Sequence, residues 1–172
     1  MVTSIDAFVF RDIEDDAAAA AVFDFVPSSE ARAMLGAALR GVRWQQKVGL
    51  VLARHRGHPA HAAQIRSQVI EYGAISELAL RESIRQARPT GVPPTFQGLI
   101  ERAVDIGILD EGGAAAAHRR RLARNAVHLD PAAAPLKVAD AAKAMKDFVT
   151  IANQCRSYAG LDRWTPVRPS PA

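Results

Sequence analysis

The chain has 172 residues, of which 49% are hydrophobic and 23% charged, and this composition is typical of one globular domain with a substantial core. Its single cysteine, Cys155, excludes an intrachain disulfide framework and a cysteine-rich zinc site. The net charge of +4 is uneven, because residues 1–30 hold seven acidic side chains and one basic one, whereas the rest hold 21 basic and 11 acidic ones. The excess of basic residues after residue 30 can attract a polyanion.

The N-terminal sequence MVTSIDAFVF lacks the basic region and the long apolar core of a signal peptide. No apolar run reaches about 18 residues, the length that a membrane-spanning helix needs. We therefore expect a cytoplasmic protein that has no membrane partner.

Alanine is abundant and runs of β-branched residues are scarce, so helices are favoured over strands. We predict an all-α bundle of four to six helices. The first expected helix is short, is capped by Asp12, Asp15 or Asp16, and ends near Val26. The other expected helices span, in chain order, residues 29–55, 60–87, 95–106, 114–129 and 136–158. These helices divide the chain into an acidic N-terminal segment (1–29), a helical bundle (30–158) and a flexible, Pro-containing tail (159–172).

For two of these helices, the sequence predicts which parts lie in the core of the bundle. In the helix over 29–55, we expect Trp44 to pack in the core or at an interface rather than to stack on bases. The helix over 60–87 is apolar on most sides and therefore belongs in the middle of the bundle. We expect its Glu77 to be exposed, with a buried contact to the basic helix over 114–129 as the alternative.

Three histidines, His55, His58 and His61, lie close together in the sequence. Only His58 and His61 have a helical i,i+3 spacing, Pro59 lies between them, and no carboxylate or cysteine accompanies them at ligand spacing. We therefore predict neither a metal site nor a cofactor.

The stretch AAAAHRRRLARNAVHLDP, residues 114–131, predicts one helix that stops near Leu129, because Pro131 disfavours helical backbone in the residue before it. Arg121, Asn125 and His128 fall on one side of this helix. Leu122, Ala126 and Leu129 form a neighbouring apolar stripe that we expect to face the core.

Arg124 lies about 60° from Arg121 around the helix, so the same edge holds two guanidinium groups, an amide and an imidazole. These are the groups that RNA cleavage without a metal needs. Arginine binds phosphate oxygens in a fork, and histidine exchanges protons near neutral pH. The ribose 2′-hydroxyl is the nucleophile, the imidazole moves protons and arginine stabilises the charge that grows on the phosphate.

The segment Arg121-Leu122-Ala123-Arg124-Asn125-Ala126-Val127-His128 resembles the signature of HEPN domains, in which four to six residues separate an arginine, often followed by asparagine, from a histidine. Arg121 matches the spacing to His128, whereas Arg124 matches the asparagine that follows the arginine. The helix order before and after this motif also resembles HEPN-like proteins found near restriction and toxin–antitoxin genes. The resemblance covers roughly residues 30–158 and implies an all-α HEPN-like bundle.

The resemblance implies a metal-independent endoribonuclease that acts on RNA as a homodimer whose two motifs meet across the interface. His128 would transfer protons, Arg121 or Arg124 would bind the phosphate, and Asn125 would orient the histidine or the phosphate. Arg119 and Arg120 match no motif position, so we expect them to contact the RNA backbone or only to aid solubility.

Two alternatives remain open at this point. In the first, the chain is not a nuclease but a non-catalytic HEPN-like module that binds RNA or a partner protein such as an antitoxin. In the second, it is a helical structural protein with no role in nucleic-acid binding. The acidic first 30 residues add the hypothesis that they fold over the basic edge of residues 114–129 and restrain it.

Overall fold

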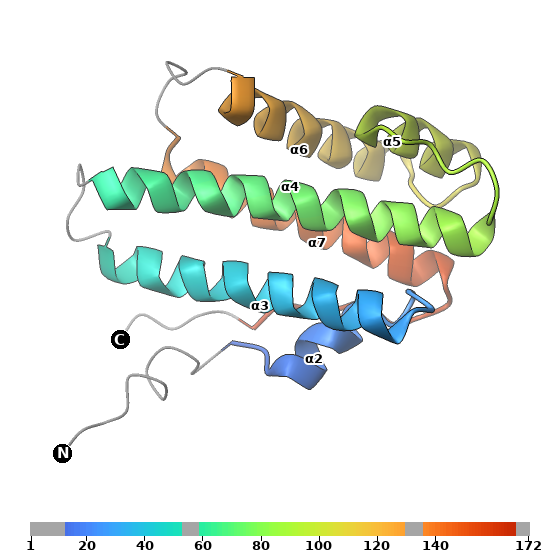
Figure 1. The fold of residues 1–172 in the computed structure, drawn as a ribbon, viewed down its shortest axis with the longest axis horizontal. Coiled ribbons are helices and arrows are strands. Elements are labelled where there is room, and N and C mark those ends of the chain that lie inside the picture. Colours follow the sequence, from blue (N-terminus) through green and yellow to red (C-terminus); the bar gives the residue numbers. More distant parts are fainter. Residues whose placement is uncertain (1–12, 53–58, 130–135, 168–172) are drawn as a thin grey trace.

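The computed structural model describes residues 13–52, 59–129 and 136–167, and within these ranges all regular secondary structure is helical. The side chains of residues 50–52 and 127–129 are not described. The helices are α2 (Asp16–Ala21), α3 (Ser29–Leu52), α4 (Pro59–Ala87), α5 (Phe96–Asp105), α6 (Glu111–Leu129) and α7 (Val138–Tyr158). Figure 1 shows the four longest, α3, α4, α6 and α7, side by side along the bundle. The prediction of an all-α bundle is confirmed.

Side-chain caps explain why several helices begin where they do. The Asp15 side chain accepts a hydrogen bond from the backbone N–H of Ala18 at 2.8 Å and so caps α2. The Ser28 hydroxyl does the same for α3, and Thr95 for α5. None of the described helices is both long enough and apolar enough to cross a membrane.

Helix α6 begins at Glu111, three residues before the predicted start at Ala114. The sequence Gly112-Gly113 indicated a turn, but Asp110 caps the helix by accepting a hydrogen bond from the backbone N–H of Gly113 at 2.8 Å. A Cβ at position 113 would overlap the end of the flexible Gln154 side chain on α7, so a larger residue there would displace Gln154 from its hydrogen bond to Asp110. The end of α6 at Leu129 is as predicted.

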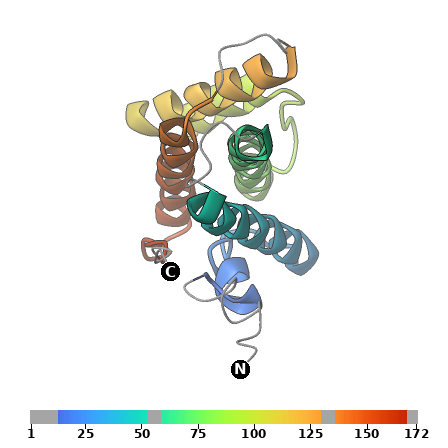
Figure 2. The same cartoon turned by 90° about the vertical axis from the view of Figure 1, so that its left-hand side faces the viewer.

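Helix α4 is the centre of the bundle and packs against α3, α5, α6 and α7 (Figures 1 and 2). Its Tyr72 is fully buried, with its ring centroid 5.5 Å from that of Phe148 on α7. Burial raises the pKa of the Tyr72 hydroxyl far above its usual value, so it stays neutral. The predicted central position of this helix is therefore confirmed, whereas Trp44 on α3 is 39% exposed and lies outside the core.

Small residues mark the places where helices approach most closely. A Cβ on Gly36 of α3 would come within 2.8 Å of the backbone nitrogen of Ala20 on α2, so only glycine fits there. Gly73 of α4 lies against Arg124 of α6, where an added Cβ would be 3.4 Å from the arginine Cβ. The contact at Gly73 brings α6 close to the central helix.

The two ends of the described chain meet at a buried arginine. Arg43 of α3 is fully buried; its Nε donates to the Glu14 carboxylate at 3.3 Å and its guanidinium also donates to the carbonyl oxygen of Val167. Further along the C-terminal segment, the backbone N–H of Trp164 donates to Asn153 at 2.7 Å. Hydrogen bonds thus hold Trp164 and Val167 against the bundle, and residues 168–172 lie outside the described part. The flexibility of residues 159–172 stays a prediction.

The acidic segment does not cover the basic helix in the part that the structure describes. Helix α2 packs on α3, and both views place it on the side of the bundle away from α6 (Figures 1 and 2). Asp16 pairs with Arg40 at 2.5 Å, and Asp24 with Arg32 at 3.6 Å. Three of the four acids within residues 13–29, Glu14, Asp16 and Asp24, thus pair with arginines of α3, and residues 1–12 lie outside the described chain.

Candidate functional site

Helix α6 turns three small residues and one arginine towards the bundle. Gly113, Ala116, Ala117 and Arg120 are buried at i, i+3, i+4 and i+7 spacing, which is one face of a helix. Leu122 is 57% exposed and Ala126 is exposed too. The prediction that the stripe faces the core is therefore wrong for Leu122 and Ala126, and the side chain of Leu129 is not described.

On the side of α6 that faces α7, two arginines share one carboxylate. Arg119 Nη2 lies 2.6 Å from Asp147 Oδ1, and Arg120 Nε lies 2.9 Å from Asp147 Oδ2. Asp147 is only 3% exposed, so its contacts with the two arginines are largely shielded from solvent. Both arginines thus hold α6 to α7, so the expectation that they only aid solubility is wrong. Contact of the exposed Arg119 with RNA stays a prediction.

Burial affects the two arginines differently. The Arg119 side chain is 42% exposed, and its hydrogen bonds to Asp147 raise its pKa. The Arg120 side chain is 4% exposed, and desolvation lowers its pKa while the carboxylate of Asp147 opposes this effect. Arginine keeps its charge at any biological pH, so the triad carries a net positive charge inside the bundle.

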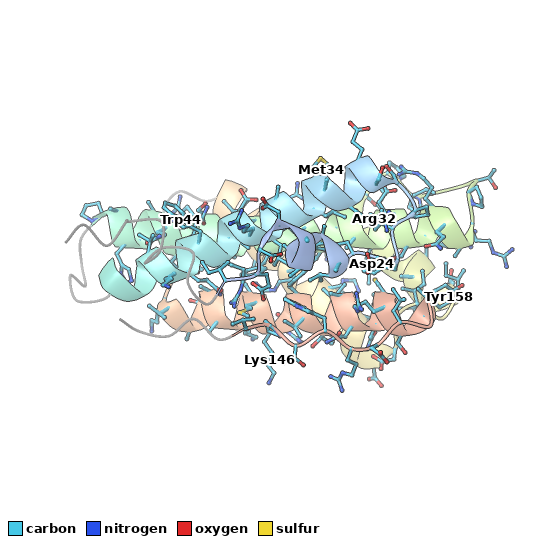
Figure 3. All side chains as sticks on the ribbon, turned by 90° about the horizontal axis from the view of Figure 1, so that it is seen from below. Asp24, Arg32, Met34, Trp44, Lys146 and Tyr158 are labelled. Carbon is cyan, nitrogen blue, oxygen red and sulfur yellow. The ribbon has the colours of Figure 1, made fainter. Side chains whose placement is uncertain are left out.

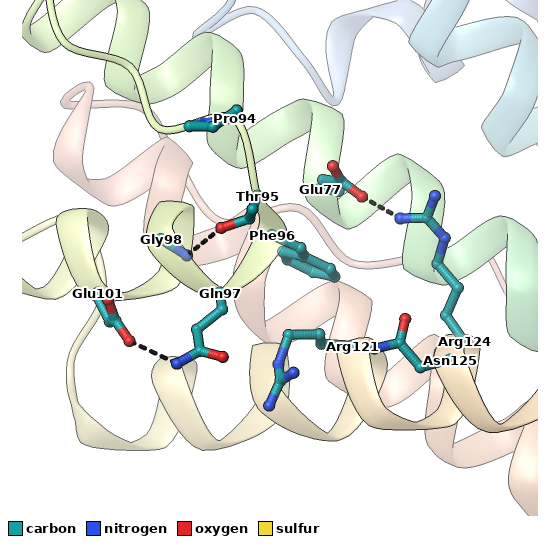
Figure 4. Close-up of a pocket in the computed structure, with 10 residues that line it drawn as sticks. All are labelled: Glu77, Pro94, Thr95, Phe96, Gln97, Gly98, Glu101, Arg121, Arg124 and Asn125. Carbon is teal, nitrogen blue, oxygen red and sulfur yellow. Dashed lines mark hydrogen bonds and ion pairs between the residues drawn. The ribbon is translucent and has the colours of Figure 1, made fainter. Parts of the chain in front are cut away.

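The other side of α6 borders a pocket of about 540 Å³ between α4, α5 and the loop before α5 (Figure 4). Three of the four predicted site residues line it, namely Arg121, Arg124 and Asn125. The remaining lining residues are Glu77, Pro94, Thr95, Phe96, Gln97, Gly98 and Glu101. The structure therefore brings both candidate motif arginines and the asparagine to one concave surface.

Arg124 is held at the wall of this pocket by Glu77 of α4. Its guanidinium donates to one carboxylate oxygen of Glu77, and Arg81 donates to the other at 2.9 Å. Glu77 is half-buried, so the default expectation of an exposed glutamate is wrong and the alternative, a contact to the basic helix, is confirmed. Arg124 is thus committed to Glu77, which it shares with Arg81.

Arg121 differs from Arg124 in having no such partner. Its side chain makes no ion pair or hydrogen bond within the described residues, and its Nε is buried without an acceptor. Figure 4 shows its guanidinium turned away from Glu77 and towards the side of Gln97. An arginine without a counterion at the wall of a pocket can bind an anion there through its remaining guanidinium N–H groups.

The last two motif residues follow on the same helix. Asn125 is exposed and lies one turn after Arg121, at the rim of the pocket. Because α6 continues to Leu129, position 128 lies nearly one further turn along the helix. The side chain of His128 is not described, so its distance to the pocket stays a prediction.

The formal charges around the pocket balance, since Arg121 and Arg124 stand against Glu77 and Glu101. Glu101 is exposed and accepts a hydrogen bond from Gln97 at 2.9 Å, so water screens its charge. Glu77 is committed to Arg124 and Arg81. Within the described part of the pocket wall, Arg121 is therefore the cation that remains available to a ligand.

Neither a metal cluster nor a related protein indicates the function. Among the described residues, no group of three or more histidine, cysteine, aspartate or glutamate side chains is placed to hold a metal ion. Of the three histidines considered above, His61 is buried, and His55 and His58 lie outside the described chain. Comparisons with protein-family models, curated proteins and solved structures found no match to this chain.

Proposed function

We propose that this chain is a HEPN-like, metal-independent endoribonuclease that acts in the cytoplasm, of the kind associated with toxin–antitoxin or defence systems. The observation that carries the proposal is the pocket beside α6. There Arg121, which has no counterion among the described residues, lies one turn before Asn125 on the helix that continues to His128. An arginine fork, an amide and an imidazole on one helix can hold a phosphodiester and move a proton at it.

In the proposed reaction, Arg121 binds the non-bridging oxygens of the scissile phosphate and stabilises the negative charge that develops on them. Asn125 donates its amide N–H to the same phosphate. His128 takes the proton of the ribose 2′-hydroxyl as the 2′-oxygen bonds to phosphorus and the bond from phosphorus to the 5′-oxygen breaks. The leaving 5′-oxygen takes a proton from water, and the protonated His128 returns its proton to the hydroxide that forms, so the products are a 2′,3′-cyclic phosphate and a 5′-hydroxyl.

The contact with Glu77 distinguishes the roles of the two candidate motif arginines. Arg124 is engaged by Glu77 and contributes to the pocket wall, whereas Arg121 has no partner among the described residues. We therefore assign the motif arginine to Arg121, which has the six-residue spacing to His128, and treat Arg124 as a positioning residue.

The proposal is tested by cleavage of a mixed-sequence RNA in EDTA. Wild type should cleave it and leave cyclic-phosphate ends, whereas His128→Ala should lose about 100-fold or more, as expected when proton transfer is removed. His118→Ala, which removes another histidine of α6, is the matched control and should cleave like wild type. Inert wild type, or a fully active and folded His128→Ala variant, would contradict the proposal.

The balance of charges favours one alternative, a non-catalytic HEPN-like module that binds RNA or a partner protein such as an antitoxin. Two arginines and two glutamates around one pocket suit a ligand that carries both donors and acceptors, as a peptide does. This alternative predicts that wild type binds its ligand without cleaving RNA, and that Arg121→Ala weakens the binding.

A further inference from the structure

The outward face of α3 is apolar and exposed from Met34 to Trp44, and the exposed Glu30 lies one turn before Met34 on the same face. Leu35, Leu39 and Val42 face the core and are buried, whereas Met34 is 54% exposed and Trp44 is 39% exposed. Figure 3 shows Met34 and Trp44 on α3. A surface helix normally has polar and charged residues opposite its core face, so α3 departs from the usual pattern.

The exposed residues of this face repeat with the spacing of a helix-packing seam. Met34, Ala37, Gly41 and Trp44 follow one another at intervals of three, four and three residues and are all exposed. At 100° per residue they fall within about 80° of one another, and their mean direction is about 180° from that of Leu39. We call these four residues the α3 seam.

Gly41 has no explanation within a single chain. A Cβ at this position would meet nothing within 4 Å, whereas a Cβ on Gly36, five residues earlier, would meet the backbone of α2 at 2.8 Å. Glycine in the middle of an exposed helix destabilises the helix relative to alanine. A glycine in open space therefore points to a close approach of another helix.

The α3 seam is symmetric in side-chain size about the position of Leu39. A two-fold axis there pairs Met34 with Trp44 of a second copy, and Ala37 with Gly41 of that copy. Two-fold interfaces use the same patch on both partners, so such a patch must be complementary to itself. In this register the small pair lets the helices approach, while each indole ring lies against a methionine, a contact that sulfur and aromatic groups favour.

Charge also suits an antiparallel pair of α3 helices. The α3 seam contains no charged residue, so pairing two copies buries no like charges, although each chain carries a net charge of +4. Antiparallel helices place the positive end of one dipole beside the negative end of the other. The seam from residue 34 to residue 44 is about 15 Å long, so the interface is smaller than that of a permanent dimer and the association should be reversible.

We infer that the chain forms a homodimer through the α3 seam, with α3 of one copy antiparallel to α3 of the other about residue 39. This inference does not rest on the proposed nuclease activity. The HEPN resemblance implies instead that the two motifs meet across the interface. In both views α4 lies between α3 and α6, so the α3 dimer leaves each pocket beside α6 within its own copy (Figures 1 and 2).

The oligomeric state tests this inference. By sedimentation velocity over micromolar concentrations, wild type should associate reversibly to a dimer. Gly41→Glu should raise the dimer dissociation constant about tenfold or more, because the new charge would be buried in the interface. The monomer has room for this side chain at position 41, so the variant should fold. Ala142→Glu, at an exposed position on α7, is the matched control and should dimerise like wild type.

Cross-linking tests the register. Cys155 is buried and burial raises the pKa of its thiol to about 11, so it should not compete with introduced thiols. A mixture of Ala37→Cys and Gly41→Cys should form more disulfide-linked dimer than either variant alone. A monomeric wild type, a dimer that Gly41→Glu does not weaken, or stronger self-linking of each single variant would overturn the inference.

Discussion

The two edges of α6 carry similar residues and do different things. Arg119 and Arg121 are two positions apart in the sequence, which places them about 160° apart around the helix. Arg119 shares Asp147 with the buried Arg120 and ties α6 to α7, whereas Arg121 borders a pocket and has no counterion among the described residues. A run of arginines in a sequence is therefore not one basic surface, because helical rotation distributes it between structure and site.

The largest effect should come from removing the shared carboxylate. Asp147→Ala leaves Arg120 buried without its counterion, so the free energy of unfolding should fall by about 3–5 kcal/mol. Urea denaturation measures this change. Asp105→Ala, at an exposed position on α5, should change the free energy by about 0.5 kcal/mol or less. A loss below about 1 kcal/mol for Asp147→Ala would show that the triad does not hold α6 in place.

The two arginines that share Asp147 should differ in how much each contributes to the free energy of unfolding, and this effect should be smaller than that of Asp147→Ala. Arg120→Ala should cost about 2–3 kcal/mol, because it removes a buried hydrogen bond to a charged group and leaves a cavity. Arg119→Ala should cost about 0.5 kcal/mol or less, since Arg119 is 42% exposed and solvent screens its ion pair. The same denaturation experiment compares them, and equal losses would contradict the difference in burial.

A substitution at the pocket beside α6 should change RNA binding rather than the free energy of unfolding. Glu77→Gln releases Arg124 and adds a second available cation beside Arg121. We expect RNA affinity to rise a few-fold at low salt, and the slope of log affinity against log salt to steepen by about 0.7, the value for one more phosphate contact. Fluorescence anisotropy at several salt concentrations measures both. Weaker binding with an unchanged slope would mean that Glu77 does not limit the charge of the pocket.

The smallest effect should appear at the start of α6. Hydrogen bonds from the backbone of Gly113 and the side chain of Gln154 hold the pKa of Asp110 below its usual value. Because the folded-state pKa is lowered, the stabilising contribution is present above the unfolded-state pKa of about 3.9 and is lost as pH falls through the folded-state value. The stability difference between wild type and Asp110→Ala should therefore be constant from about pH 5 to 8 and shrink in stronger acid. A difference that grows in acid would have the wrong sign.

The helices could be predicted from the sequence because their ends carry local signals. Pro131 after Leu129, the caps at Asp15 and Thr95, and the proline-rich loop before α5 act through neighbouring backbone alone. Where a distant residue decides, the prediction failed. Gly112-Gly113 indicated a turn, but Asp110 caps a helix there and also accepts a hydrogen bond from Gln154 on α7, a contact that cannot be read from the residues around position 113.

The site was predictable in part for the same reason. Helical spacing placed Arg121 and Asn125 together, as the pocket confirms. The roles of Arg119 and Arg120 depend on Asp147, which is 27 or more residues away in the sequence and lies on another helix. A carboxylate that interrupts a central apolar helix, as Glu77 does on α4, was the available signal for the partner of Arg124.

The most direct test of this account compares Arg121→Ala with Arg119→Ala in RNA cleavage in EDTA, with the unfolding free energy of each variant measured alongside. If the pocket edge is the active site, Arg121→Ala should lose about 100-fold or more in kcat/KM and stay as stable as wild type. Arg119→Ala, which removes the same charge from the opposite edge, should retain nearly all activity. Equal activity of the two variants, or a larger loss for Arg119→Ala, would contradict the assignment of Arg121 to the phosphate.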